Sequence, residues 1–220
     1  MKKHILCFGD SNTHGYCADR RDSADFGERF NEEERWTCLL QQMLGDAYLV
    51  IEEGLSGRTT VFEDPLREGA SGLKALKPTL ESHKPLDLLI LMLGTNDCKQ
   101  RFSNNAYTIA MGMERLITLA QSLPVWTYDV PNILVIAPPP IEEAMLKSPA
   151  VEDMGPQALE LSRKLAKKYA FACLAHRCQF LDASGIGEMN PVDGMHLTRE
   201  GHRKLAEKLA QLIPGLLENG

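Results

Sequence analysis

Two short segments at opposite ends of the chain carry the residue types that nucleophilic catalysis needs. Asp193 and His196 stand three positions apart, so a carboxylate and an imidazole can share one turn of the backbone. The carboxylate can orient the ring, and the ring can take a proton from a serine in another part of the fold. Ser11, in the sequence Gly9-Asp10-Ser11, is the serine that we expect in this role. The combination predicts an enzyme that makes a serine hydroxyl nucleophilic at neutral pH.

A third segment offers a group that can stabilise the negative charge of an acyl-transfer transition state. Gly94-Thr95-Asn96-Asp97 contains an amide side chain, and such amides serve in oxyanion holes. The backbone N–H of Ser11 would also be free if a strand ends and a helix begins there. We therefore interpret the three segments together as the parts of a serine esterase.

Each segment also has a purely structural interpretation. Asp10 or Ser11 can cap a following helix, and Asp193-Gly194 can form a turn. Asn96 can be a turn residue with a left-handed backbone, and Asp97 is more typical of a structural role. The sequence around Ser11 is not G-x-S-x-G, so the nucleophile elbow of the α/β-hydrolases does not apply.

The elements that must position these residues alternate between strand and helix. Apolar runs predict strands at 4–8, 48–51, 87–93, 132–136 and 179–182. Amphipathic patterns predict helices at 35–44, 71–83, 104–123, 155–175 and 199–217, the last with Thr198 as its N-cap. This alternation predicts an α/β fold with a parallel sheet covered on both faces by helices.

The candidate residues all follow predicted strands. In open parallel sheets, ligands bind beyond the carboxyl ends of the strands. Ser11, Gly57, Asn96 and His196 follow the first, second, third and fifth predicted strands, so we expect them at one edge of the sheet. The loops 18–34 and 138–153 are long and polar or proline-rich, and loops of this length often frame a site.

Composition and charge exclude several classes of function. The 220 residues are 44% hydrophobic and 25% charged, which suits one globular domain spanning 1–220. A net charge of −6, without a dense Lys/Arg stripe, argues against a nucleic-acid partner. No signal-peptide pattern or membrane-length apolar run is present, so we expect a cytoplasmic protein with no membrane partner.

The cysteines do not indicate a disulfide framework or a metal site. Six are scattered along the chain without a C-x-x-C pair, and we expect them to stay reduced. His176 lies between Cys173 and Cys178, and His14 lies three positions before Cys17, but neither has a second ligand pair at zinc-like spacing. We therefore predict that the chain binds no metal.

Four sequence blocks, taken in order, resemble those of the SGNH hydrolases, also called the GDSL lipase/esterase family. The blocks are Gly9-Asp10-Ser11-Asn12-Thr13, Gly57, Gly94-Thr95-Asn96-Asp97 and Asp193-Gly194-Met195-His196. The resemblance implies a flavodoxin-like three-layer α/β/α sandwich with a five-stranded parallel sheet. It also implies that Ser11 is the nucleophile, His196 the base and Asp193 its orienting partner, and that no metal or organic cofactor takes part.

The same resemblance implies an oxyanion hole and a substrate class. The backbone N–H groups of Ser11 and Gly57 and the side-chain amide of Asn96 would bind the oxyanion. Finer motifs resemble the arylesterase and acyltransferase-like branch; they are 5–11, 35–37, 51–60, 93–97 and 138–140. Members of that branch hydrolyse small esters, and some transfer the acyl group to alcohols. The branch also tends to form homo-oligomers in which neighbouring subunits narrow the entrance.

The pocket is expected to be short and to have a polar mouth. We expect Asn12, Tyr16, Thr95 and Met195 to line it, with the stretch 141–145 as a further candidate. Tyr16 stands where the branch would have a tryptophan, and Asn12 where it would have an apolar residue. Two alternatives remain: a flavodoxin-like binder of phosphate or nucleotides, and an inactive binding module on the same fold. The chain has neither G-x-x-x-x-G-K-[ST] nor G-x-G-x-x-G, which disfavours the first.

Overall fold

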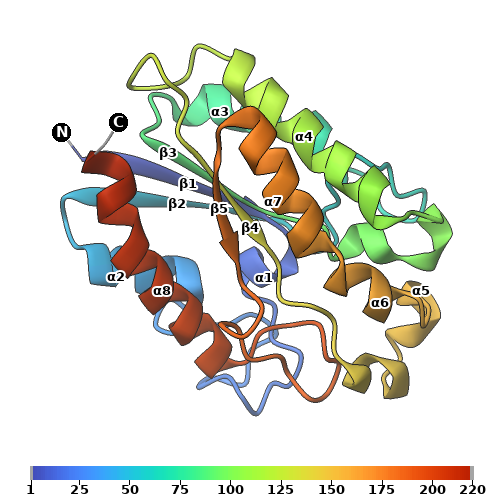
Figure 1. Ribbon diagram of the computed structural model, residues 1–220. Helices are drawn as coiled ribbons and strands as arrows, with labels where there is room; N and C mark the ends of the chain where they lie inside the picture. The colour runs from blue at the N-terminus through green and yellow to red at the C-terminus, as the bar shows by residue number, and fades with distance from the viewer. Residues whose placement is uncertain (1, 219–220) are drawn as a thin grey trace.

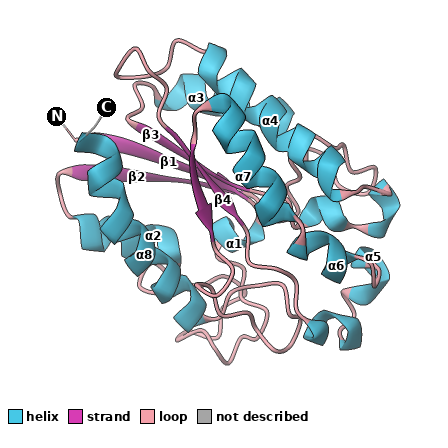
Figure 2. Ribbon diagram, in the orientation of Figure 1, coloured by secondary structure: helices cyan, strands magenta, loops and turns pink. Residues whose placement is uncertain are grey.

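Five strands form one parallel sheet in the order β2-β1-β3-β4-β5, as Figures 1 and 2 show for the computed structural model, which describes residues 2–218. The strands are β1 (Lys3–Gly9), β2 (Tyr48–Gly54), β3 (Leu88–Met92), β4 (Ile133–Ala137) and β5 (Gln179–Asp182). β3 and β4 are buried along their whole length, which is why their sequences are continuous apolar runs. The predicted parallel sheet is confirmed.

Helices cover both faces of this sheet (Figure 1). The helices are α1 (Ser11–His14), α2 (Trp36–Leu44), α3 (Gly72–His83), α4 (Ala106–Ser122), α5 (Val151–Met154), α6 (Ala158–Arg163), α7 (Leu165–His176) and α8 (Arg199–Glu218). Short 3-10 turns are η1 (Asn96–Cys98), η2 (Gln100–Phe102) and η3 (Glu143–Lys147). α2 and α8 pack on one face, and α3, α4 and α7 pack on the other. The three-layer α/β/α arrangement matches the expectation.

Each face of the sheet has its own hydrophobic core, because successive side chains along a strand point to opposite faces. On β1, Ile5 and Cys7 face the layer of α2 and α8, whereas Leu6 and Phe8 face the opposite layer. On α8, the apolar residues predicted to form one face do pack into the core beside α2. Thr198 caps this helix as predicted, because its hydroxyl accepts a hydrogen bond of 2.9 Å from the N–H of Gly201.

The predicted helix 155–175 is wrong in its extent, because the structure divides it into α6 and α7. Gly155 has φ +72° and ends α5 instead of starting a helix. The chain between α6 and α7 tightens at Lys164, whose N–H bonds to the carbonyl of Leu161 three residues back. Just before this turn, the hydroxyl of Ser162 accepts a hydrogen bond of 3.0 Å from the N–H of Ile141. The loop 18–34 contains no helix, but 138–153 includes η3 and the start of α5.

The ends of three neighbouring strands lie level, and a short helix packs across them. Gly9 pairs with Gly54 on β2 and with Met92 on β3. A Cβ on Gly54 would lie 2.2 Å from the backbone nitrogen of His14, so only glycine lets α1 approach β2 this closely. α1 was not predicted from the sequence. Its position places Ser11 at the carboxyl edge of the sheet.

An ion pair joins α2 to β2 beside α1. Arg35 contacts both oxygens of Glu52, with Nε–Oε2 at 2.7 Å and Nη2–Oε1 at 2.9 Å, and the hydroxyl of Thr37 also donates to Glu52. Burial alone would raise the pKa of the Glu52 carboxyl, but these bonds lower it to about 2. The carboxylate is therefore ionised at neutral pH.

We expect Glu52→Gln to lower the free energy of unfolding by about 2–3 kcal/mol at pH 7. The folded-state pKa lies below the unfolded value, so the contribution is present above about pH 5 and is lost as the pH falls toward 2. The difference in the free energy of unfolding between the variant and the wild type should therefore be about 1 kcal/mol smaller at pH 3.5 than at pH 7. Urea unfolding at both pH values measures this difference, and Glu143→Gln, at an exposed position, is the control. If the difference in the free energy of unfolding is the same at both pH values, the pKa of Glu52 is not lowered by the ion pair.

Candidate active site

Ser11 is the first residue of α1 and lies directly beyond β1. The preceding residue, Asp10, caps this helix: its Oδ1 accepts a hydrogen bond of 3.0 Å from the N–H of Asn12. Burial raises the pKa of the Asp10 carboxyl to about 6. Because Asp10 serves as the cap, the hydroxyl of Ser11 is left for another partner.

That partner is His196, which in turn is held by Asp193. Nε2 of His196 lies 2.9 Å from Oγ of Ser11, and Nδ1 lies 2.6 Å from Oδ2 of Asp193. The other carboxylate oxygen accepts hydrogen bonds from the N–H groups of Met195 and His196, at 3.0 and 3.2 Å. Burial opposes ionisation, but these donors hold the pKa of Asp193 below its usual value. An ionised Asp193 favours the proton on Nδ1, which leaves Nε2 free to accept a proton from Ser11.

Asn12 has a different position from the one expected. It is 2% exposed and does not line the cavity beside Ser11. Its amide nitrogen donates to the carbonyl of Met195 at 3.1 Å, and its amide oxygen accepts from the N–H of Leu197 at 2.9 Å. The two bonds bracket His196 in the chain. Asn12 therefore links α1 to the segment 193–197 that carries His196, called the histidine loop below. Its assignment to the pocket is corrected.

The histidine loop is also supported from the side of residues 141–145. Gly194 has φ +63°, and its carbonyl accepts a hydrogen bond of 2.8 Å from the N–H of Glu142. A Cβ on Gly194 would lie 2.9 Å from the carbonyl oxygen of Glu142, so the two segments are in direct contact. Ile141 and Met145 are buried in the core instead of facing substrate. The expectation that this stretch lines the pocket is therefore wrong.

The residues expected to bind an oxyanion lie on the turns after β2 and β3. Gly57 has φ +84°, a conformation that favours glycine. The side-chain amide of Asn96 donates to the carbonyl of Arg58 at 3.2 Å, which fixes its orientation beside the Gly57 turn. Both line the same cavity as Ser11. Thr95, the partly buried residue before η1, does not line it, so its assignment to the pocket is corrected.

Asp97 and Tyr169 form hydrogen bonds that hold the turn carrying Asn96 in place. Asp97 is fully buried and accepts hydrogen bonds from the backbone N–H of Thr60 at 3.0 and 3.1 Å, and from the Thr60 hydroxyl. Burial raises the pKa of its carboxyl to about 7. The hydroxyl of Tyr169 donates to the carbonyl of Leu93 at 3.0 Å, just before the turn. Asp97 has the structural role that the sequence indicated.

Ser11, His196 and Asp193 line a cavity of about 290 Å³. Tyr16 lies at its edge with its ring centroid 4.6 Å from that of His196. The lining residues are Ser11, Tyr16, Ser56, Gly57, Arg67, Asn96, Lys99, Ala150, Asp153, Met154, Asp193, Met195 and His196. Tyr16 and Met195 were expected here, whereas Arg67, Lys99 and Asp153 were not. Lys99 follows Asn96 by three positions, and this closeness could have placed it near the site. Arg67 lies in a loop and Asp153 in α5, and neither belongs to a sequence motif.

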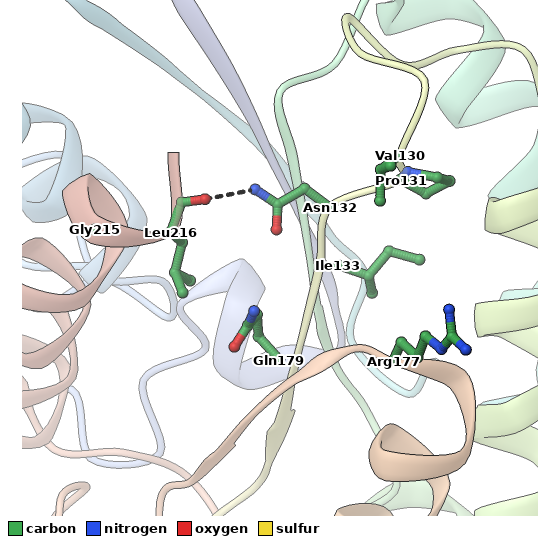
Figure 3. A pocket seen from close by; sticks show the side chains of 8 residues that line it. All are labelled: Val130, Pro131, Asn132, Ile133, Arg177, Gln179, Gly215 and Leu216. Carbon is green, nitrogen blue, oxygen red and sulfur yellow. Dashed lines mark hydrogen bonds between the residues drawn. The ribbon is translucent and has the colours of Figure 1, made fainter. Parts of the chain in front are cut away.

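A larger hollow lies at the opposite edge of the sheet, near the amino ends of β4 and β5 (Figure 3). It measures about 430 Å³ and is lined by Val130, Pro131, Asn132, Ile133, Arg177, Gln179, Gly215 and Leu216. The amide of Asn132 donates to the carbonyl of Leu216 at 3.1 Å across it. None of its lining side chains is a nucleophile, a carboxylate or a histidine. The smaller cavity, which Ser11 and His196 line, is the candidate active site.

The structure also bears on metals and membranes. Within residues 2–218, no three His, Cys, Asp or Glu side chains are arranged to hold a metal ion. His176, considered above beside Cys173 and Cys178, has its Nε2 3.7 Å from Oε2 of Glu114. None of the helices described in that range combines the length and the apolar character needed to cross a bilayer.

Comparisons with known proteins agree with this geometry. The sequence profile of the GDSL-like lipase/acylhydrolase family matches residues 7–204. The chain is 26% identical to an acetylxylan esterase of Xylanibacter ruminicola over 227 residues, covering 95% of the chain. It spans only 42% of the length of that curated relative.

Solved structures of similar size align over almost the whole chain. Est24, a carbohydrate acetylesterase from Sinorhizobium meliloti, is 37% identical with a TM-score of 0.89, covering 98% of this chain and 100% of that one. The M. smegmatis aryl esterase is 38% identical with a TM-score of 0.87 and the same coverage. A structure described as a putative arylesterase, from Agrobacterium tumefaciens str. C58, is 34% identical with a TM-score of 0.84, again with the same coverage.

Proposed function

This chain belongs to the GDSL-like lipase/acylhydrolase family of carboxylic ester hydrolases, and we propose that it hydrolyses short-chain esters through a triad of Ser11, His196 and Asp193. The observation that carries the proposal is the continuous pair of hydrogen bonds, 2.9 Å from Ser11 to His196 and 2.6 Å from His196 to Asp193, among residues that line one cavity. A nucleophile, a base and an orienting carboxylate within bonding distance are what acyl transfer at neutral pH needs.

The reaction proceeds in two halves. As Oγ of Ser11 attacks the ester carbonyl, Nε2 of His196 takes the hydroxyl proton, and Asp193 stabilises the imidazolium. The N–H groups of Ser11 and Gly57 and the amide of Asn96 bind the oxyanion. The tetrahedral intermediate collapses, its carbon–oxygen bond to the alcohol breaks, and His196 protonates the departing oxygen. Water then gives a proton to Nε2 of His196 as it attacks the acyl carbon. The bond from that carbon to Oγ of Ser11 breaks, His196 returns the proton to Oγ, and the acid leaves the free enzyme.

Covalent labelling distinguishes a serine esterase from the two alternatives, a phosphate-binding protein and an inactive module. A fluorophosphonate reacts with an activated serine and does not react with a serine that only caps a helix or contacts phosphate. A phosphate-binding protein or an inactive module on this fold would stay unlabelled. Labelling of the intact chain, with the modified residue located by mass spectrometry, tests the proposal directly, and we expect modification of Ser11.

We expect kcat/KM to be highest for acetyl and butyryl esters and to fall at least tenfold by octanoate. The cavity measures about 290 Å³, and the apolar side chains that line it include Ala150, Met154 and Met195. Each methylene that fits contributes up to about 0.8 kcal/mol, or roughly fourfold, and each methylene that does not fit weakens binding. A series of 4-nitrophenyl esters from C2 to C12 measures this. A preference that rises through dodecanoate would show a lipase-like channel instead.

The relatives support acetyl as the first acyl group to test. One is described as a carbohydrate acetylesterase and another as an acetylxylan esterase, and both names specify acetyl. Transfer of the acyl group to an alcohol in place of water is part of the same proposal, because any hydroxyl that His196 can deprotonate can attack the acyl-serine. Assembly into homo-oligomers remains a prediction from the sequence.

A further inference from the structure

Arg58 is a buried cation next to Gly57 that the proposed mechanism does not use. It is 5% exposed and does not line the cavity. Within residues 2–218, no carboxylate forms an ion pair with its guanidinium, and the carboxylate of Glu53 pairs with His83 instead, with Oε1 2.8 Å from Nε2. Nε of Arg58 also lacks a hydrogen-bond partner in that range. A buried charge without an ion pair is unfavourable for stability, so these features point to a role other than stability.

The guanidinium of Arg58 joins the carboxyl ends of two strands. Nη1 donates to the carbonyl of Gly9 at 2.9 Å and also to the carbonyl of Glu53. Gly9 is the last residue of β1 and stands two positions before Ser11, whereas Glu53 is the penultimate residue of β2. Cζ of the guanidinium lies 4.0 Å from the centroid of the Phe8 ring, so the group also stacks on β1. The side chain therefore fixes the point at which the chain leaves β1 for Ser11.

The backbone of Arg58 contacts the segments that carry the other two proposed oxyanion donors. Arg58 follows Gly57 directly, and its N–H donates to the carbonyl of Leu55 at 3.0 Å, which closes the turn around Gly57. Its carbonyl accepts a hydrogen bond of 3.2 Å from Nδ2 of Asn96. An amide nitrogen has two hydrogens, so this bond leaves the second one for an oxyanion. Arg58 is therefore bonded to, or adjacent to, all three segments that carry the proposed donors.

We propose, on the basis of the proposed esterase function, that Arg58 is a positioning residue that sets the spacing of the three oxyanion donors. The N–H groups of Ser11 and Gly57 and the amide of Asn96 must point together at the place that one oxygen occupies in the transition state. Without the guanidinium, the ends of β1 and β2 lose a shared donor, and the N–H groups of Ser11 and Gly57 can move apart. Arg58 does not touch the reacting atoms and acts only through these donors.

Arg58→Met tests this role, because methionine keeps an unbranched apolar stem beside Phe8 and removes the N–H donors. The carbonyl of Gly9 keeps a hydrogen bond of 3.1 Å from the N–H of Leu55, so we expect the variant to fold, which thermal unfolding checks. We expect kcat for 4-nitrophenyl acetate to fall about 10- to 100-fold, with KM within about twofold of the wild-type value. Removing an oxyanion donor outright costs roughly 10²–10³-fold, and here the donors are displaced but not removed.

Two ketones with the same carbon skeleton separate positioning from a general loss of structure. When Oγ of Ser11 bonds to the carbonyl carbon of 1,1,1-trifluoro-4-phenylbutan-2-one, the carbonyl π electrons move to the oxygen as an oxyanion and His196 takes the hydroxyl proton. The matching methyl ketone, 4-phenylbutan-2-one, binds without this addition. In Arg58→Met, the inhibition constant of the trifluoromethyl ketone should rise by the factor by which kcat/KM falls. The inhibition constant of the methyl ketone should stay within about twofold of wild type, because it forms no oxyanion.

Arg115→Met is the matched control, since it makes the same change at an exposed position on α4 and should alter neither inhibition constant. Arg58→Lys is the second variant, for use if Arg58→Met does not fold, because lysine keeps the charge and one donating group. Its loss of kcat/KM should be smaller and should again equal the loss of affinity for the trifluoromethyl ketone.

The two inhibition constants also show which proposal fails. If a folded Arg58 variant changes both constants by the same factor, or changes neither, the inference is overturned and the esterase proposal stands. If the wild type cleaves no 4-nitrophenyl acetate and binds the two ketones equally, the result counts against the proposed function itself.

Discussion

Ser11→Ala is expected to lower kcat for 4-nitrophenyl acetate by at least about 10⁴-fold while leaving the protein folded. The hydroxyl of Ser11 has His196 as its partner at 2.9 Å, and the residue lies at the start of α1, at the edge of a cavity. Removing one oxygen there leaves no hole in either core. The helix cap is also retained, because Asp10 provides it.

The measurement combines kinetics, labelling and thermal unfolding. The variant should lose labelling by a fluorophosphonate and keep its thermal midpoint within about 2 °C, since no core contact is removed. Ser122→Ala is a suitable control, because Ser122 is exposed at the end of α4 and its hydroxyl donates to the carbonyl of Leu119, three residues before it. Residual activity above roughly a hundredth of wild type would contradict the role of Ser11 as the nucleophile.

The fold and the closeness of Ser11, Asp193 and His196 could be anticipated from the sequence, because both depend on local patterns. Continuous apolar runs at 87–93 and 132–136 mark strands covered on both faces, and parallel strands place their following loops at one edge. The spacing of Asp193 and His196 allows one turn to bring the carboxylate to Nδ1. Thr198 is found at the cap where its hydroxyl was expected.

The parts that were missed depend on contacts between distant segments. The resemblance to the esterase branch placed Asn12 at the pocket mouth, yet its amide bonds to backbone groups more than 180 residues later. No periodicity in the sequence encodes that register. Arg67 lies against Gly57, where a Cβ would be 2.6 Å from its Cδ and Nε. Helix α1 has four residues, which is too short for an amphipathic pattern to form.

Asp193→Asn provides the sharpest test of how the triad is held, and we expect it to lower kcat by about 10⁴-fold. Oδ1 of Asp193 accepts hydrogen bonds from two backbone N–H groups, and Oδ2 faces Nδ1 of His196. In the variant, the amide oxygen must remain on the backbone donors, so the NH₂ group faces the ring. Nδ1 then has to accept a hydrogen bond, which places the ring proton on Nε2.

A proton on Nε2 blocks the reaction without changing the shape of the site. Nε2 lies 2.9 Å from Oγ of Ser11 and must accept the hydroxyl proton, which it cannot do when it is already protonated. The loss should therefore approach that of Ser11→Ala. The double variant should lose little more than either single one, because residues that act as a unit are not additive.

The control is Asp129→Asn, an exposed position with the same change of charge, and kcat there should stay at the wild-type value. Thermal unfolding should show that Asp193→Asn remains folded, because the amide oxygen keeps the two backbone bonds that shape the histidine loop. If kcat falls by less than tenfold, the ring of His196 does not depend on Asp193 for its tautomer. The base would then be oriented by its other neighbours, such as the ring of Tyr16 at 4.6 Å.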